Sequence, residues 1–556
     1  MHERSRVRFL IAIVAIVYGN TLANGFAQDD QIYIFENHAV TAHSARELFL
    51  PNVLSHVFRP LSFLTLSANW AVSGARPFTY HLCNLLLHAA ATCLLYWLFR
   101  RLLEGLPCAA ETAFVAGLLF AVHPIHTEAV ANVVGRSELL AAGFLFGAWL
   151  LHLRGRHILA LAGFALALLS KESAVVFLPL VLLADYLRGS LKPAWRYFSL
   201  AGLMLLYVAI FWKVQGGQFG AVIPFLDNPL GGLPTGLRIL NAFRIAANYL
   251  SLLVYPSSLS CDYSYNSITL YANGRAWLGA LPMLVVLAVW LWSFFTRRGE
   301  WALAGGIYLV GFSVTANILF PVGTIMGERL AYLPSAGFCL LIALLWARLR
   351  VRAPELALAI LAVALIGLSV RTTLRNFAWR DNFTLYSTAL RVVPGSAKMH
   401  NSIAAEYANR GQPERARAEY DTALKIYGDY PEALESFGLL ESSVGNDAHA
   451  RQLLTAAVSL AQKGSLKYDF AVVNLAAHLI KMSEYARALP LLNQVIADSP
   501  GYARAWANRA VLYFKCGDLS SARSDALIAI RLDPGNSLAL NLLSFLQAPP
   551  PSANAR

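Results

Sequence analysis

Two adjacent carboxylates, Asp29 and Asp30, follow directly after the first apolar segment of the chain and are its first acidic residues after Glu3. Neighbouring carboxylates at the mouth of a membrane span repel each other and are costly to desolvate. They therefore normally face water, a metal ion or a substrate. We predict that this pair marks an active site, in which one carboxylate takes a proton as a general base.

Further polar residues lie inside or beside apolar runs, where such residues commonly serve a function. His81, Asn84 and His88 recur at i, i+3 and i+7, and so share one stripe of a helix. We expect these side chains and several others to form a pocket with the two aspartates. The other pocket candidates are Arg59, His123, His126, Glu128, Glu172, Glu328 and Tyr332, together with His56. The basic candidates for binding a phosphate are Arg136, Lys171 and Arg329.

Each candidate also has a purely structural interpretation. Buried imidazoles often hydrogen-bond between helices, and Lys171-Glu172 could be an ordinary ion pair in a loop. His123, His126 and Glu128 are metal-ligand types, but the proline between the two histidines disrupts the helical spacing that a zinc motif requires. The six cysteines are scattered without a Cys-x-x-Cys pair. We therefore assign no cofactor, and leave open only a divalent cation at Asp29/Asp30.

A lipid-linked phosphosugar would suit carboxylates and basic residues gathered at a membrane surface. Its phosphate leaves as an anion that Arg or Lys can stabilise, so no acid has to protonate the leaving group. A single carboxylate then suffices as general base on an acceptor hydroxyl, and one displacement inverts the anomeric centre. The apolar helices would hold the lipid chain of the donor.

The composition predicts an integral membrane protein, because 57% of the 556 residues are hydrophobic and only 14% are charged. The net charge of +13 lies in short basic clusters between apolar runs, a pattern typical of membrane topology and not of nucleic-acid binding. Runs of about spanning length begin near residues 9, 80, 112, 138, 158, 173, 197, 276, 301, 330 and 355. We predict about eleven transmembrane helices in an all-α fold.

The basic clusters follow every second predicted span, which places them and the N-terminus on the cytoplasmic side. The candidate site and everything after residue 371 then lie on the opposite side. Residues 238–255 are apolar but carry two arginines and two asparagines, so we interpret them as an interfacial or re-entrant helix. Whether they span stays open.

A 34-residue repeat occupies the C-terminal part of the chain. Trp506, Ala510, Tyr513, Ala522 and Ala529 lie between Pro500 and Pro534 at the offsets of a tetratricopeptide repeat, and earlier copies keep the register. Such repeats stack into an α-solenoid with a concave binding surface. We predict four repeats, at 397–430, 431–464, 469–502 and 503–536. The predicted domains are a membrane domain (1–371), a linker (372–396) and a repeat domain with a capping helix (397–547).

Together these motifs resemble the transmembrane and tetratricopeptide-repeat-containing (TMTC) proteins, a branch of the GT-C glycosyltransferases related to protein O-mannosyltransferases. The matching stretches are FAQDD at 26–30, FRPL at 58–61, HLCNLLLH at 81–88, HPIHTEAV at 123–130, GRSELL at 135–140, SKE at 170–172 and GERLAYLPS at 327–335.

The resemblance implies transfer of a hexose, typically mannose, from a polyprenyl-phosphate sugar to a protein hydroxyl, with Asp29 or Asp30 as base. We prefer Asp30. No organelle address occurs in the sequence, so we expect a bacterial inner membrane with periplasmic repeats, or a lumenal repeat domain in a eukaryote. The alternatives are a glycosyltransferase acting on lipid or envelope polysaccharide, and a noncatalytic membrane scaffold that displays repeats.

Overall fold

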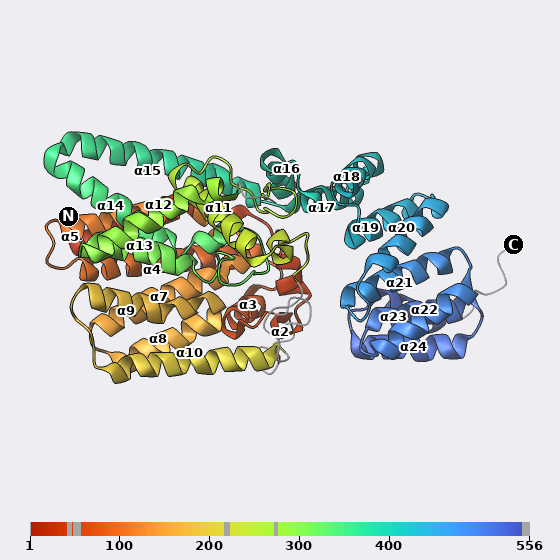
Figure 1. Cartoon of the computed structure of the whole chain (residues 1–556). Coiled ribbons are helices and arrows are strands. Elements are labelled where there is room, and N and C mark those ends of the chain that lie inside the picture. The colour runs from red at the N-terminus through yellow and green to blue at the C-terminus, as the bar shows by residue number, and fades with distance from the viewer. Residues whose placement is uncertain (1, 42–46, 48–56, 216–222, 272–275, 548–556) are drawn as a thin grey trace. The chain divides into compact units, whose positions relative to one another are not determined.

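The computed structural model describes residues 2–41, 47, 57–215, 223–271 and 276–547, so His56 lies outside the described residues. Helices joined by turns and irregular loops make up these residues, and no strand occurs among them. The predicted all-α fold is confirmed. The chain forms two compact units, Met1–Ser396 and Ala397–Arg556 (Figure 1).

Each of the eleven predicted apolar runs coincides with a helix of the first unit. These helices are α1 (Glu3–Tyr18), α4 (Pro77–Leu102), α5 (Ala109–Val122), α7 (Arg136–Leu153), α8 (His157–Ser170), α9 (Phe177–Leu187), α10 (Ala194–Val214), α12 (Ala276–Phe295), α13 (Gly299–Phe312), α14 (Ser335–Arg352) and α15 (Pro354–Asn376). Helix α4 begins with Pro77 and carries Arg100 and Arg101 in its last turn, where a cation complements the helix dipole.

Seven helices of the described chain are long and apolar enough to cross a membrane, or eight if the bent pair of α5 with the following short helices counts as one span. Helices α8, α9 and α13 have only 14, 11 and 14 residues, fewer than the roughly 20 that a bilayer needs. The total of eleven spans therefore stays a prediction. Helix α11 (Thr235–Val254) is one of these seven helices. Its Arg238 donates a hydrogen bond to the carbonyl of Asn317 at 2.7 Å.

The core of the first unit forms where α4 packs against α1, α5 and α7. Its largest fully buried side chains include Tyr96, Phe99, Phe120, Phe146 and Trp149. The chain then breaks at His123-Pro124 and reverses through short turns, with a bend of 52° between α5 and the following pair of short helices. This break brings the polar stretch 123–138 to one end of the helices.

Several short elements complete the end of the unit that carries the site. They are η1 (Gly19–Ala23), η2 (Gln31–Phe35), α2 (His38–Thr41), α3 (Pro60–Ser73), η4 (Pro124–His126), α6 (Thr127–Ala131), η5 (Val133–Gly135), η6 (Glu172–Val176), η7 (Pro229–Gly232) and η8 (Glu328–Ala331). The chain between α6 and α7 turns tightly at Gly135, where a Cβ would overlap the carbonyl of Ala129.

Residues 372–396, predicted as a linker, pack within the first unit. They contain the end of α15, η9 (Phe377–Trp379) and α16 (Asn382–Val392). The carbonyl of Arg380 accepts from the N–H of Gly25 at 2.9 Å, and the Oδ1 of Asn382 accepts from the N–H of Gln28 at 2.7 Å. The boundary between the units falls at Ser396, because this segment is hydrogen-bonded to the loop that follows α1.

The second unit is a series of antiparallel helix pairs, as expected for tetratricopeptide repeats. The pairs are α17 (Ala397–Asn409) with α18 (Pro413–Ile426), α19 (Pro431–Ser443) with α20 (Asp447–Leu460), α21 (Leu466–Lys481) with α22 (Tyr485–Asp498), and α23 (Ala503–Lys515) with α24 (Leu519–Leu532), followed by α25 (Ser537–Gln547). Small residues such as Ala404, Ala476 and Ala510 are fully buried where paired helices meet.

Candidate active site

A cavity of about 1450 Å³ lies in the first unit and combines a polar group of side chains with a long apolar lining. Its volume exceeds that of pockets for drug-sized ligands, which hold roughly 300–1,000 Å³. The charged lining residues are Asp29, Arg59, Lys171, Glu172, Asp227 and Arg329. The apolar lining residues include Ile32, Val175, Met204, Val208, Phe211, Ile223, Phe225, Val314, Phe320 and Leu330. The cavity can therefore accept a large amphipathic molecule that carries an anion.

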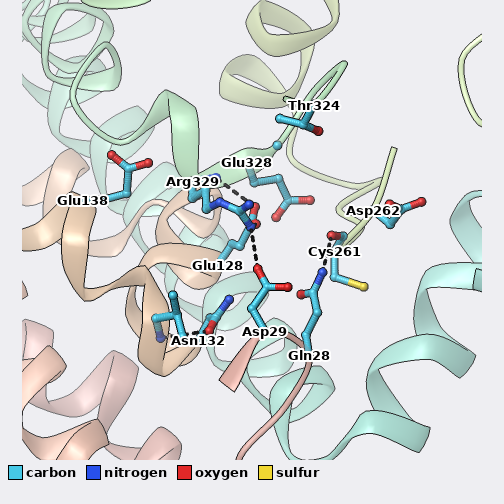
Figure 2. Close-up of polar contacts among 12 residues, drawn as sticks. Gln28, Asp29, Glu128, Asn132, Glu138, Cys261, Asp262, Thr324, Glu328 and Arg329 are labelled. Carbon is cyan, nitrogen blue, oxygen red and sulfur yellow. Dashed lines mark hydrogen bonds and ion pairs between the residues drawn. The ribbon is translucent and has the colours of Figure 1, made fainter. Parts of the chain in front are cut away.

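Asp29 presents its carboxylate to this cavity. The side chain is about one-third exposed, at 34%, and one carboxylate oxygen lies 3.9 Å from Nη1 of Arg329. Gln28 adopts a left-handed φ of 56°, and its N–H is held by Asn382, which turns the chain just before Asp29. Figure 2 shows Asp29 and Arg329 pointing toward each other. Asp29 therefore keeps a carboxylate available to a ligand.

Asp30 is buried, although it is adjacent in sequence. Its side-chain oxygens accept hydrogen bonds from the backbone N–H groups of Ala27 at 2.9 Å and Val134 at 3.2 Å. Burial raises the pKa of Asp30 to about 7. Asp30 does not line the cavity but ties the loop after α1 to the turn before α7. The geometry thus favours Asp29, whereas the sequence led us to prefer Asp30.

Three cations line the cavity in the described chain, and each is paired with a carboxylate. Arg59 donates from Nε and Nη2 to Glu172, at 3.0 and 2.6 Å. Burial alone would raise the pKa of Glu172, but the charge and hydrogen bonds of Arg59 outweigh it and lower this pKa to about 2. The other two pairs are Lys171 with Glu138 and Arg329 with Glu128.

Glu128 holds Arg329 by two contacts. Its Oε1 accepts from the guanidinium at 2.5 Å and its Oε2 accepts from the Arg329 backbone N–H at 2.9 Å (Figure 2). Glu128 is only 1% exposed, whereas the side chain of Arg329 is 29% exposed. The buried carboxylate therefore fixes a cation that still faces the cavity, beside Asp29.

Arg136 does not fit the predicted phosphate contact. The side chain is fully buried and does not line the cavity. Its guanidinium donates to the Oδ1 of Asn84 at 2.9 Å and of Asn69 at 2.5 Å, and to the carbonyls of Thr65 and Tyr80, each at 3.0 Å. A phosphate could reach this guanidinium only if those bonds were broken.

The predicted pocket histidines are also buried and bind other parts of the fold. His88 bonds the hydroxyl of Tyr332 at 2.8 Å, and His126 bonds that of Ser335 at 2.7 Å. His81 and His123 bond the carbonyls of Gly25 and Leu253, and Asn84 donates to three carbonyls of residues 130–133. None of these side chains lines the cavity. They connect the segments that carry the site.

Glu328 is likewise buried beside the cavity. Its Oε1 accepts from the N–H of Ser260 at 2.5 Å and from the hydroxyl of Tyr263 at 2.9 Å. Burial raises the pKa of Glu328 to about 8, although Arg375, 4.0 Å away, opposes this. Glu328 thus anchors η8, the element from which Arg329 reaches the cavity.

The residues do not fit a divalent cation bound between Asp29 and Asp30. The Asp29 carboxylate faces Arg329, whereas both oxygens of Asp30 accept backbone N–H groups. Within the described ranges, no group of three or more His, Cys, Asp or Glu side chains is placed to hold a metal ion.

Comparison with known proteins gives matches to both units. A family model described as "Tetratricopeptide repeat" matches residues 479–544. Human "Protein O-mannosyl-transferase TMTC3" is 28% identical over 96% of this chain and 64% of its own length. The Caenorhabditis elegans "Protein O-mannosyl-transferase F38B6.6" is 30% identical over 76% of this chain and 62% of its own. The chain resembles the TMTC proteins over most of its length. The resemblance predicted from the motifs is thereby confirmed.

The chain spans about 64% and 62% of the length of these two TMTC-type relatives. Among solved structures, that of MamA residues 41-end from Desulfovibrio magneticus RS-1 is 25% identical and has a TM-score of 0.24, over 27% of this chain and 82% of that one.

Glu138, which pairs with the cavity residue Lys171 but does not itself line the cavity, and Tyr207, which lines it, were not assigned a role from the sequence. Glu138 lies at the start of a predicted span, and its pairing with Lys171 joins residues 33 positions apart. Tyr207 lies in a run of apolar residues and gave no signal of its own. The TMTC motifs contain Glu138 but not Tyr207, since the matching stretches do not extend into α10.

Proposed function

We propose that this chain is a GT-C type glycosyltransferase that transfers a hexose from a polyprenyl-phosphate sugar to a Ser or Thr hydroxyl of a protein. The observation that carries the proposal is a single cavity in which a partly exposed carboxylate, Asp29, lies with three cations, and which continues into an apolar lining. The names of the TMTC relatives support mannose as the sugar and protein as the acceptor.

The donor phosphate would bind Arg329, Arg59 and Lys171, with Arg59 taking the place first expected for Arg136. Glu172 occupies two donor nitrogens of Arg59, and Glu128 contacts one side-chain nitrogen of Arg329, so both guanidiniums keep further N–H groups. Because each cation is already held by a carboxylate, little side-chain freedom is lost when the phosphate binds.

Catalysis follows from the position of Asp29 beside Arg329. The acceptor hydroxyl attacks the anomeric carbon while its proton passes to the Asp29 carboxylate. The bond from the anomeric carbon to the phosphate oxygen breaks, and its electron pair stays on the polyprenyl phosphate, whose charge Arg329 and Arg59 stabilise. A single displacement of this kind inverts the anomeric configuration.

The two units would have different roles in the reaction. The first unit would span the membrane with the N-terminus in the cytoplasm and the cavity on the opposite, periplasmic or lumenal, side. The tetratricopeptide repeats would bind the protein acceptor on that same side, because stacked repeats offer a concave surface for a polypeptide.

The proposal is tested by Asp29→Asn in the full chain reconstituted in lipid nanodiscs. Polyprenyl-phosphate mannose and Ser/Thr-containing acceptor proteins are supplied, and mass spectrometry detects hexose on the acceptors. We expect a loss of about 10²- to 10⁴-fold in the transfer rate, the range that a positioned general base contributes. The matched control is Glu36→Gln, which removes an exposed carboxylate seven residues away that does not line the cavity. Full transfer by Asp29→Asn would refute the proposal, and hexose found only on lipid would refute the protein acceptor.

A further inference from the structure

Tyr207 has a buried hydroxyl that the proposed chemistry does not use. Its side chain lines the cavity and is 6% exposed, and its hydroxyl has no hydrogen-bond partner among the described residues. A buried hydroxyl without a partner is unfavourable, because no hydrogen bond replaces those it would make to water. Such a group in a cavity wall therefore points to a ligand that supplies the missing hydrogen-bond partner.

The ring of Tyr207 is held so that the hydroxyl lies near the charged end of the cavity. Its centroid is 6.5 Å from that of Phe58 and 6.1 Å from that of Phe211. The hydroxyl interacts electrostatically with Glu172 and Arg59. The phenol thus stands between the ion pairs and the apolar part of the lining.

Helix α10 continues this lining away from the charges. Met204, Tyr207, Val208 and Phe211 recur at i, i+3, i+4 and i+7, so they form one stripe that faces the cavity. The opposite surface is exposed at Leu205 and Leu206, and α10 lies at an edge of the first unit (Figure 1). Within a membrane, one helix would then separate the cavity from the lipid.

We infer that the Tyr207 hydroxyl donates a hydrogen bond to the phosphate of a long-chain lipid phosphate, whose first apolar units lie along the α10 stripe. This rests on the proposed function and adds a residue and a location for the tail. A free phosphate would satisfy the hydroxyl but would leave Met204, Val208 and Phe211 uncovered in a cavity of about 1450 Å³. Burial of this apolar surface by an acyl or prenyl chain favours the lipid over free phosphate.

The test compares Tyr207→Phe with Tyr308→Phe in the full chain in nanodiscs. Both substitutions remove only a hydroxyl, and Tyr308 is also buried, at 5% exposed, with no hydroxyl partner in the described chain, but it does not line the cavity. Binding of long-chain polyprenyl phosphate, geranyl phosphate and inorganic phosphate is measured by thermal shift and by fluorescence titration. We expect Tyr207→Phe to raise the Kd for the long-chain lipid roughly tenfold, since a hydrogen bond to a charged group is worth about 1.5 kcal/mol or more. Tyr308→Phe should leave it unchanged.

The outcomes separate this inference from the proposed function. Equal affinity of Tyr207→Phe, Tyr308→Phe and wild type for the long-chain lipid would overturn the role of Tyr207, while loss of transfer by Asp29→Asn would still support the enzyme. Equal affinity of wild type for inorganic phosphate and for the long-chain lipid would overturn the placement of the tail. Asp29→Asn should bind the lipid at least as tightly as wild type, because it removes a negative charge near the phosphate.

Discussion

Two groups of polar residues in the first unit have similar composition but different surroundings. The cavity group consists of Asp29, Arg59, Lys171, Glu172 and Arg329. The buried group consists of Asp30, Asn84, His88, His126 and Arg136. Asp29 and Arg329 are 34% and 29% exposed at their side chains, whereas Asp30 and Arg136 are 1% and 0% exposed. Residue type alone therefore does not tell which group can act on a substrate.

The difference lies in hydrogen-bonding capacity that is still open to a ligand. Arg136 donates to four oxygens of the protein, and Asp30 accepts two backbone N–H groups. A ligand that bound either would have to displace bonds worth as much as its own. Arg59 and Arg329, by contrast, keep N–H groups beyond those that contact Glu172 and Glu128. We therefore expect the buried group to fix the geometry and the cavity group to contact the substrate.

Arg136→Met gives the largest expected change, and it should affect stability. It keeps an unbranched side chain but leaves the side-chain oxygens of Asn69 and Asn84 and the carbonyls of Thr65 and Tyr80 without their donor. We expect a loss of about 3–5 kcal/mol in unfolding free energy, because four acceptors, two of them buried, lose their partners together. The thermal midpoint of the chain in nanodiscs measures it. An unchanged midpoint with weakened lipid-phosphate binding would place Arg136 in the cavity group.

Arg329→Gln should reduce transfer about 10²- to 10³-fold, the effect of removing one donor that stabilises a developing charge. It also leaves Glu128 buried without its cation, so some stability is lost as well. The double variant Arg329→Gln/Glu128→Gln removes both charges. It should recover the thermal midpoint without recovering transfer. Recovery of both would show that Arg329 only balances the charge of Glu128.

The helices of both units could be predicted from local sequence patterns. Each of the eleven apolar runs became a helix, and the register of alanines such as Ala404, Ala510 and Ala529 marked the repeat helices. Hydrophobic periodicity and repeat spacing are carried by neighbouring residues, so they can be read from the chain. Whether each helix spans the membrane depends on neighbours and on the bilayer, and the short helices α8 and α13 leave that a prediction.

The site was only partly visible in the sequence because its decisive contacts are nonlocal. Asp29, Lys171 and Arg329 were expected in the site and do line the cavity. Asp30 is directed away from it by an N–H group of Val134, which is 104 residues distant. Arg136 is saturated by partners from α3 and α4 that no motif joins to it. Side-chain direction in irregular segments has no period to reveal it.

Asp30→Asn should have the smallest effect of these substitutions. Compared with Asp29→Asn, it tests most directly which of the two carboxylates is the base. The amide can accept only one of the two backbone N–H groups, so its NH₂ faces the other donor. We expect a loss of about 1–2 kcal/mol in stability, with a smaller loss of transfer than for Asp29→Asn.

Burial raises the pKa of Asp30 from 3.8 to about 7, so the folded chain holds this proton more tightly than the unfolded chain. The stability that this proton contributes to the folded wild type is present below about pH 4 and is lost as the pH rises through about 7. The difference in stability between wild type and Asp30→Asn should therefore narrow over this range. Thermal midpoints across that range measure the gap. Loss of transfer with an unchanged midpoint at every pH would make Asp30 the base and reverse the assignment of the two carboxylates.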